Sequence, residues 1–195
     1  GMMIPNYSGK ESWNKYNALG VTQYGQMTAG SYMYIGPQGI VHGTTITLLN
    51  AGRLHDLGKD LKGKVFVTSG LGGMSGAQSI AGLITGAVTI IAEVDPDAVQ
   101  QRVTDGYIQS ENVYTDLNDL IEKLEHCRKN RIPITLVYHG NIVDLWEKFA
   151  EDDIKVELGS DQTSLHNIDD LGYCPAGYSF AEAEKLLIKN KVKFM

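Results

Sequence analysis

Short apolar runs alternate with amphipathic stretches along most of this chain. Three runs rich in β-branched and aromatic residues predict buried strands over 64–69, 88–95 and 132–140, and a weaker run predicts a fourth over 154–162. Apolar positions at helical spacing predict helices over 115–130, 142–153 and 179–192. Small and aliphatic residues over 74–87 suit a helix that packs closely on a sheet. The alternation predicts an α/β fold: a parallel sheet with helices on both faces.

The first 40 residues differ in character from the rest. Residues 24–39 are rich in glycine, tyrosine and small polar side chains, and 31–35 is their best strand candidate. A helix is predicted over 40–54, although three threonines lower its helix propensity. We therefore divide the chain into an N-terminal segment over 1–40, which is rich in glycine and tyrosine, and a domain over 41–195.

Composition narrows the classes of function. The 195 residues carry a formal net charge of -6, which disfavours a nucleic-acid surface. The longest apolar stretch, 80–94, is too short and too interrupted by glycine and threonine to span a membrane. Two cysteines and five scattered histidines show no metal-ligand spacing. We expect a cytoplasmic protein without a metal site.

The segment VFVTSGLGGMSGAQ (65–78) places four glycines between a predicted strand and a predicted helix. In a parallel sheet such a turn brings backbone N–H groups and a helix N-terminus to the ligand-binding edge, where they suit a pyrophosphate. The G-x-G-x-x-G pattern is imperfect, because Ser75 holds its last position. Glu93 ends the next strand, where a Rossmann-like fold places the carboxylate that binds a ribose and favours NAD over NADP. A packing turn or another kind of phosphate site remains the alternative.

Several longer stretches are more specific than this pattern. YGQMTAGSYMYIGPQGIVHGT, TSGLGGMSGAQ, HGN, and DQTSLH followed by GYCPAGY occur in one order, between about residues 6 and 180. In residue identity, order and spacing these stretches resemble the urocanases (urocanate hydratases), and specifically the central NAD-binding domain of those proteins. The resemblance implies a Rossmann-like domain and places 1–40 against the core of a longer protein.

The resemblance also implies a reaction and its partners. Urocanases are hydro-lyases that add water to urocanate in histidine degradation, act as homodimers, and use NAD+ as an electrophile rather than as a hydride carrier. Their catalytic cysteine belongs to a later segment, and neither Cys127 nor Cys174 lies in its motif. We therefore expect this chain to bind the cofactor but not to turn over urocanate alone.

Carried over residue by residue, the resemblance assigns the cofactor contacts to individual positions. They are Gln26, Gly73, Met74, Ser75, Glu93, Asn141, Ile142, Gln162, Thr163, Ser164, Leu165, His166, Tyr173 and Cys174. Ser75 stands where the family commonly has glycine, and Ala98 where it has an arginine. No catalytic residue is assigned.

Two other functions fit the same fold. An NAD-linked dehydrogenase would need a catalytic acid and a substrate domain. A non-enzymatic nucleotide-binding module would need the fold alone.

Overall fold

The computed structural model describes residues 10–20, 37–160 and 171–194 of the chain. The chain divides into two compact units, one over Ile40–Gln162 and the other combining 1–39 with 163–195. Each unit is described by itself. The strand expected over 31–35 lies outside the described residues.

The first unit is built on one parallel sheet. Its strands are β1 (Val65–Ser69), β2 (Val88–Glu93), β3 (Val113–Tyr114), β4 (Ile134–His139) and β5 (Leu158–Gly159). They are arranged in the order β3-β4-β2-β1-β5, and every neighbouring pair is parallel. The predicted parallel sheet is therefore confirmed, with β1, β2 and β4 in the predicted runs.

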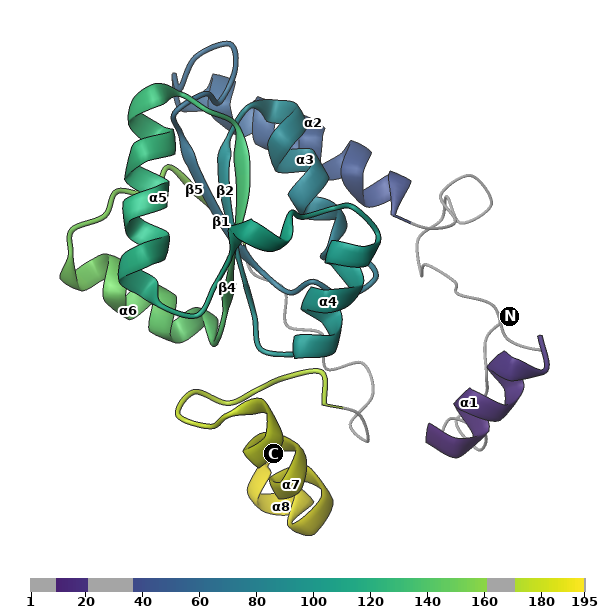
Figure 1. Ribbon diagram of the computed structural model, residues 1–195. Coiled ribbons are helices and arrows are strands. Elements are labelled where there is room, and N and C mark those ends of the chain that lie inside the picture. Colours follow the sequence, from purple (N-terminus) through teal and green to yellow (C-terminus); the bar gives the residue numbers. More distant parts are fainter. Residues whose placement is uncertain (1–9, 21–36, 161–170, 195) are drawn as a thin grey trace. The chain divides into compact units, whose positions relative to one another are not determined.

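The helices of this unit cover both faces of the sheet (Figure 1). They are α2 (Gln38–Leu54), α3 (Ala77–Thr85), α4 (Pro96–Thr104), α5 (Leu117–Asn130) and α6 (Ile142–Glu151), with a 3-10 turn at Ser110–Asn112. Such alternation is the doubly wound arrangement of Rossmann-like folds. The predicted fold class is confirmed.

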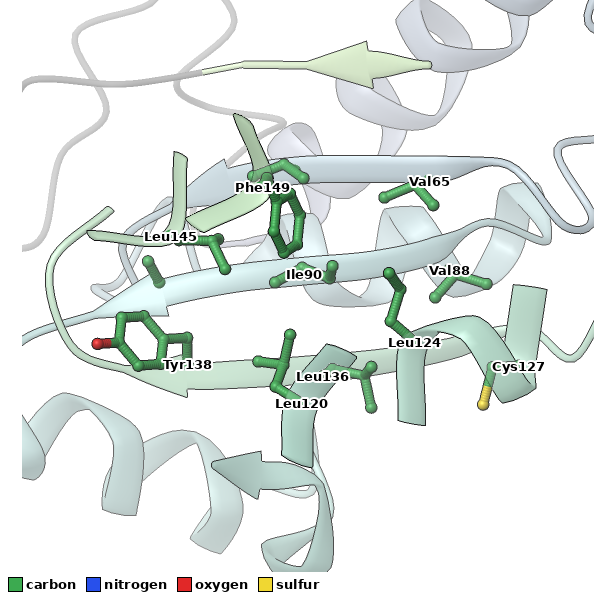
Figure 2. Close-up of a cluster of buried hydrophobic side chains, with 12 residues drawn as sticks. Val65, Val88, Ile90, Leu120, Leu124, Cys127, Leu136, Tyr138, Leu145 and Phe149 are labelled. Atoms are coloured by element: carbon green, nitrogen blue, oxygen red, sulfur yellow. The ribbon is translucent and has the colours of Figure 1, made fainter. Parts of the chain in front are cut away.

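One face of the sheet packs against α5 and α6 (Figure 2). Alternate strand residues point to this side because successive side chains of a strand face opposite ways. The buried cluster comprises Val65, Val67, Val88, Ile90, Ala92, Leu120, Leu124, Cys127, Leu136, Tyr138, Leu145 and Phe149. Burial raises the pKa of the Cys127 thiol, so this cysteine behaves as a core side chain rather than as a nucleophile.

The opposite face carries α2, α3 and α4. Leu48 of α2 packs with Phe66, while Val99 of α4 packs with Ile91 and Val137. Between them α3 lies directly on the sheet, where the Thr135 hydroxyl donates to the Ser79 carbonyl over 3.0 Å. The close packing predicted for this helix is thus present.

Side-chain caps fix where several helices begin, and so where the loops at the strand ends lie. Asp95, Asp116 and Asn141 each accept a hydrogen bond from a backbone N–H in the first turn of α4, α5 and α6 respectively. All three caps come two residues after a strand end. The strands thereby deliver loops of fixed geometry to one edge of the sheet.

The second unit contributes α1 (Lys10–Ala18), α7 (Phe180–Lys189) and α8 (Lys191–Phe194). Ser179 caps α7 in a capping box with Glu182, as the sequence predicted for Ser179. Ala183, Leu187 and Phe194 form a small buried cluster in this C-terminal part. In the described part of the chain, no helix is both long and apolar enough to cross a membrane.

Candidate functional site

The glycine segment forms the turn between β1 and α3. Gly70 follows β1 with φ at +89°, a conformation that side chains with a Cβ rarely adopt, and its N–H donates to the Ala92 carbonyl over 2.8 Å. Six residues on, a Cβ at Gly76 would lie 2.9 Å from the Gly72 carbonyl oxygen. Both glycines let the chain turn sharply from strand to helix, so the loop residues 72–75 lie at the carboxyl end of β1.

The backbone donors of this loop are available to a ligand. Among the residues that the structure describes, no group accepts a hydrogen bond from the N–H of Gly72, Gly73, Met74 or Ser75. Gly72 and Gly73 are exposed, and the helix dipole of α3 adds a partial positive charge. Consecutive free N–H groups before a helix are the arrangement that binds phosphate. The loop therefore fits the pyrophosphate of a dinucleotide.

The side chain of Ser75 turns back over the loop. A Cβ built on Gly70 would lie 2.7 Å from the Ser75 hydroxyl oxygen and 3.2 Å from the Ser75 Cβ. The hydroxyl thus occupies the space above Gly70. The Ser75 side chain is accommodated inside the turn.

Glu93 joins the end of β2 to the glycine loop. One carboxylate oxygen accepts a hydrogen bond from the N–H of Leu71, and the other accepts from the N–H of Asp95 over 3.0 Å. A carboxylate has about four lone-pair sites, so about two remain for hydroxyl donors of a ligand. The half-buried Glu93 therefore fits the ribose position expected for it and also braces the loop.

Asn141 and Ile142 lie at the carboxyl end of β4. The Asn141 side chain accepts a hydrogen bond from the Val143 N–H over 3.0 Å, which caps α6. Ile142 packs against the core cluster under α5 and α6. Both residues are on the edge of the sheet that carries the glycine loop, and their described contacts are structural.

The other predicted contacts belong to the second unit or lie outside the described residues. Tyr173 and Cys174 belong to the second unit, where the Cys174 sulfur lies 3.4 Å from the Tyr178 carbonyl oxygen. Gln26 and Gln162–His166 lie outside the described residues. The structure therefore brings together Gly73, Met74, Ser75, Glu93, Asn141 and Ile142 at one edge.

One polar cluster at this edge was not predicted from the sequence. Thr68, Gln78 and Ser160 share hydrogen bonds at the ends of β1 and β5. A polar residue inside an otherwise apolar run, as at Thr68 and Gln78, was the available signal.

Arg102 of α4 runs alongside Gly76, bonds to Asp105 over 2.8 Å and lies over the Tyr107 ring.

Tyr138 is an ionisable residue near this edge. Burial raises the pKa of the Tyr138 hydroxyl, and the carboxylates of Asp144 and Asp116 raise it further, so this phenol stays neutral. The described ranges contain no set of three His, Cys, Asp or Glu residues that could hold a metal ion. The arrangement suits the binding of a dinucleotide.

Comparison with known proteins points to one family. The family description "Urocanase Rossmann-like domain" matches residues 36–195, and "Urocanase N-terminal domain" matches residues 1–33. A "Probable urocanate hydratase" of Dictyostelium discoideum is 56% identical over 195 residues, and the "Urocanate hydratase" of Homo sapiens is 51% identical over 199. All of this chain is covered in both comparisons, but only 29% of either relative is. A "Probable urocanate hydratase" of Halobacterium salinarum is 39% identical over 94% of this chain and 31% of its own length.

Proposed function

Because the chain belongs to the urocanase family, we propose that it is the NAD-binding part of a urocanate hydratase, an enzyme that adds water to urocanate. The observation that carries the proposal is the row of backbone N–H groups over Gly72–Ser75, just before α3, which have no acceptor among the described residues. The Glu93 carboxylate, hydrogen bonded to the same loop, supports it. Bound NAD+ would supply an electrophilic nicotinamide ring, a kind of group that the ordinary protein side chains do not provide.

Different residues of the described part would bind different groups of the cofactor. The N–H groups of Gly73, Met74 and Ser75 would bind the pyrophosphate, and Glu93 would accept from the hydroxyls of the adenosine ribose. The negative charge of Glu93 would also repel the 2′-phosphate of NADP. Asn141 and Ile142, which follow β4, would contact the cofactor at the same edge of the sheet.

The remaining assignments rest on the family resemblance. They place Gln26, the loop Gln162–His166, Tyr173 and Cys174 around the same cofactor. A cytoplasmic homodimer is part of the same proposal, and so is an N-terminal segment over 1–40 that packs on the core of the whole enzyme.

Titration calorimetry of this chain tests the proposal. NAD+ should bind with a dissociation constant in the micromolar range or below, and NADP+ should bind at least about tenfold more weakly, a difference of about 1.4 kcal/mol. Circular dichroism of the same sample should confirm that the chain is folded. A folded sample that binds neither nucleotide, or that prefers NADP+, would contradict the proposed site.

A further inference from the structure

The order of the strands reverses beside β1. The chain passes from β1 to β2 and then to β3 and β4 on one side, and it returns to place β5 on the other side of β1. In open parallel sheets the point where the strand order reverses is where ligands enter between the carboxyl ends. Here that point lies between Ser69 of β1 and Gly159 of β5.

A polar cluster lies at this point of the sheet. Thr68 of β1 is fully buried, and its hydroxyl lies 3.3 Å from Oε1 of Gln78 in the first turn of α3. The Ser160 hydroxyl, just after β5, lies 3.1 Å from the same oxygen and 3.0 Å from the Thr68 hydroxyl. The Gln78 carboxamide is thereby held between the ends of the two strands.

The hydrogen bonds of Gln78 are incomplete. Its side-chain oxygen has two hydroxyl partners, whereas its NH2 group donates to no group in the part of the chain that the structure describes. The residue is only 7% exposed. The NH2 nitrogen is not among the wholly buried side-chain atoms without a partner in the described part of the chain, so this donor keeps enough exposure to meet a ligand.

The position of Gln78 relative to Glu93 indicates which part of a ligand it would meet. Glu93 is on the β2 side of β1, where the adenosine ribose would bind, and the loop Gly72–Ser75 would hold the pyrophosphate between. The other half of a dinucleotide would then extend past the end of β1 toward β5. Gln78 is on that side, because its carboxamide contacts Ser160.

We propose that Gln78 is a further cofactor contact, whose carboxamide NH2 donates to an oxygen in the nicotinamide half of the dinucleotide. This inference rests on the proposed NAD binding. It assigns Gln78 a specificity role, since a ligand lacking that half cannot use the donor.

The test compares NAD+ with ADP, which keeps the adenosine and pyrophosphate but lacks the nicotinamide half. Gln78→Met keeps the chain length and removes both polar atoms, and it should weaken NAD+ binding about tenfold while ADP binding stays within about twofold. Gln100→Met makes the same change on the exposed side of α4 and should alter neither affinity.

A second variant separates loss of the donor from loss of the hydrogen bonds to Thr68 and Ser160. Gln78→Glu keeps acceptor oxygens for Thr68 and Ser160 but replaces the donor with a carboxylate, so it should weaken NAD+ binding more than Gln78→Met does. Thermal unfolding followed by circular dichroism checks that each variant is folded.

The possible failures can be told apart. Folded Gln78 variants that bind NAD+ within twofold of the unmodified chain would show a structural role for Gln78 and overturn this inference alone. An equal loss for NAD+ and ADP would also overturn it, because the contact would not then lie in the nicotinamide half. An unmodified chain that binds neither nucleotide would contradict the proposed function itself.

Discussion

Replacing Gly82 with alanine should lower the free energy of unfolding by about 3 kcal/mol, because overpacking a tight contact forces helix and strand apart. Gly82 lies in the middle of α3, and a Cβ built there would overlap the Thr89 hydroxyl and lie 2.9 Å from the Thr89 Cβ. Thr89 is fully buried on the central strand β2 and has little room to move. Urea unfolding at equilibrium measures the loss.

Gly43→Ala is the matched control for this change. Gly43 also lies within a helix, α2, but a Cβ there would meet nothing within 4 Å. Alanine is the better helix former, so this variant should be as stable as the unmodified chain or more stable by about 0.5 kcal/mol. Similar losses for Gly82→Ala and Gly43→Ala would show that close packing of α3 on β2 is not what requires the glycine.

The same substitution bears on the cofactor site. The loop Gly72–Ser75 leads directly into α3, so the distance between α3 and β2 sets where its N–H groups lie. A helix displaced from β2 would carry those donors away from Glu93, which bonds the Leu71 N–H from the end of the same strand. NAD+ affinity should therefore fall together with stability in Gly82→Ala.

Replacing Glu93 with alanine should weaken NAD+ binding tenfold or more, about 1.4 kcal/mol. The substitution removes the acceptor for ribose hydroxyls and also the carboxylate that bonds the N–H groups of Leu71 and Asp95. Calorimetry with NAD+ measures the loss. Glu122→Ala, at an exposed position of α5, makes the same change away from the site and should leave the affinity unaltered.

A comparison with NADP+ separates the two roles of Glu93. If the carboxylate faces the ribose, Glu93→Gln should narrow the preference for NAD+ over NADP+, because a neutral amide no longer repels a 2′-phosphate. If Glu93 only braces the loop, Glu93→Gln should reduce the affinities for NAD+ and NADP+ equally. An unchanged preference in a folded Glu93→Gln variant would therefore remove the ribose assignment and leave Glu93 as a support of the loop.

Much of the fold could be predicted because the buried strands are strongly apolar. The runs that became β1, β2 and β4 are continuous, and their helices carry clear apolar faces. Neither the helices α1 and α4 nor the strand β3 was predicted. Val99 is the one buried residue of α4, and β3 has two residues, so α4 and β3 leave no periodic pattern of apolar positions in the sequence. The fourth strand was expected over 154–162, but only Leu158 and Gly159 pair with β1.

The helix over 40–54 shows how packing overrides propensity. Three threonines disfavour it, yet α2 extends over Gln38–Leu54 because Leu48 is buried against Phe66 and Leu61. Local preferences of a few tenths of a kcal/mol per residue are smaller than the gain from burying one leucine, about 2 kcal/mol.

The site was less accessible to sequence reasoning than the fold. Motifs indicated Gly73, Met74, Ser75 and Glu93, and parallel strands bring them to one edge. The hydrogen bond from Leu71 to Glu93 depends on the register of β1 against β2, which no local pattern contains. The contact of Gln78 with Ser160 joins residues separated by 82 positions, and only the return of β5 beside β1 creates it.

The central claim is that a dinucleotide binds on the carboxyl edge of the sheet, and heteronuclear NMR of the isotope-labelled chain tests it most directly. Addition of NAD+ should shift the amide signals of Gly72–Ser75 most strongly, with smaller shifts for Glu93 and Ser160 and little change in α5. Saturable shifts in α5 or α7 with an unperturbed glycine loop, or no shift at millimolar NAD+, would contradict the account.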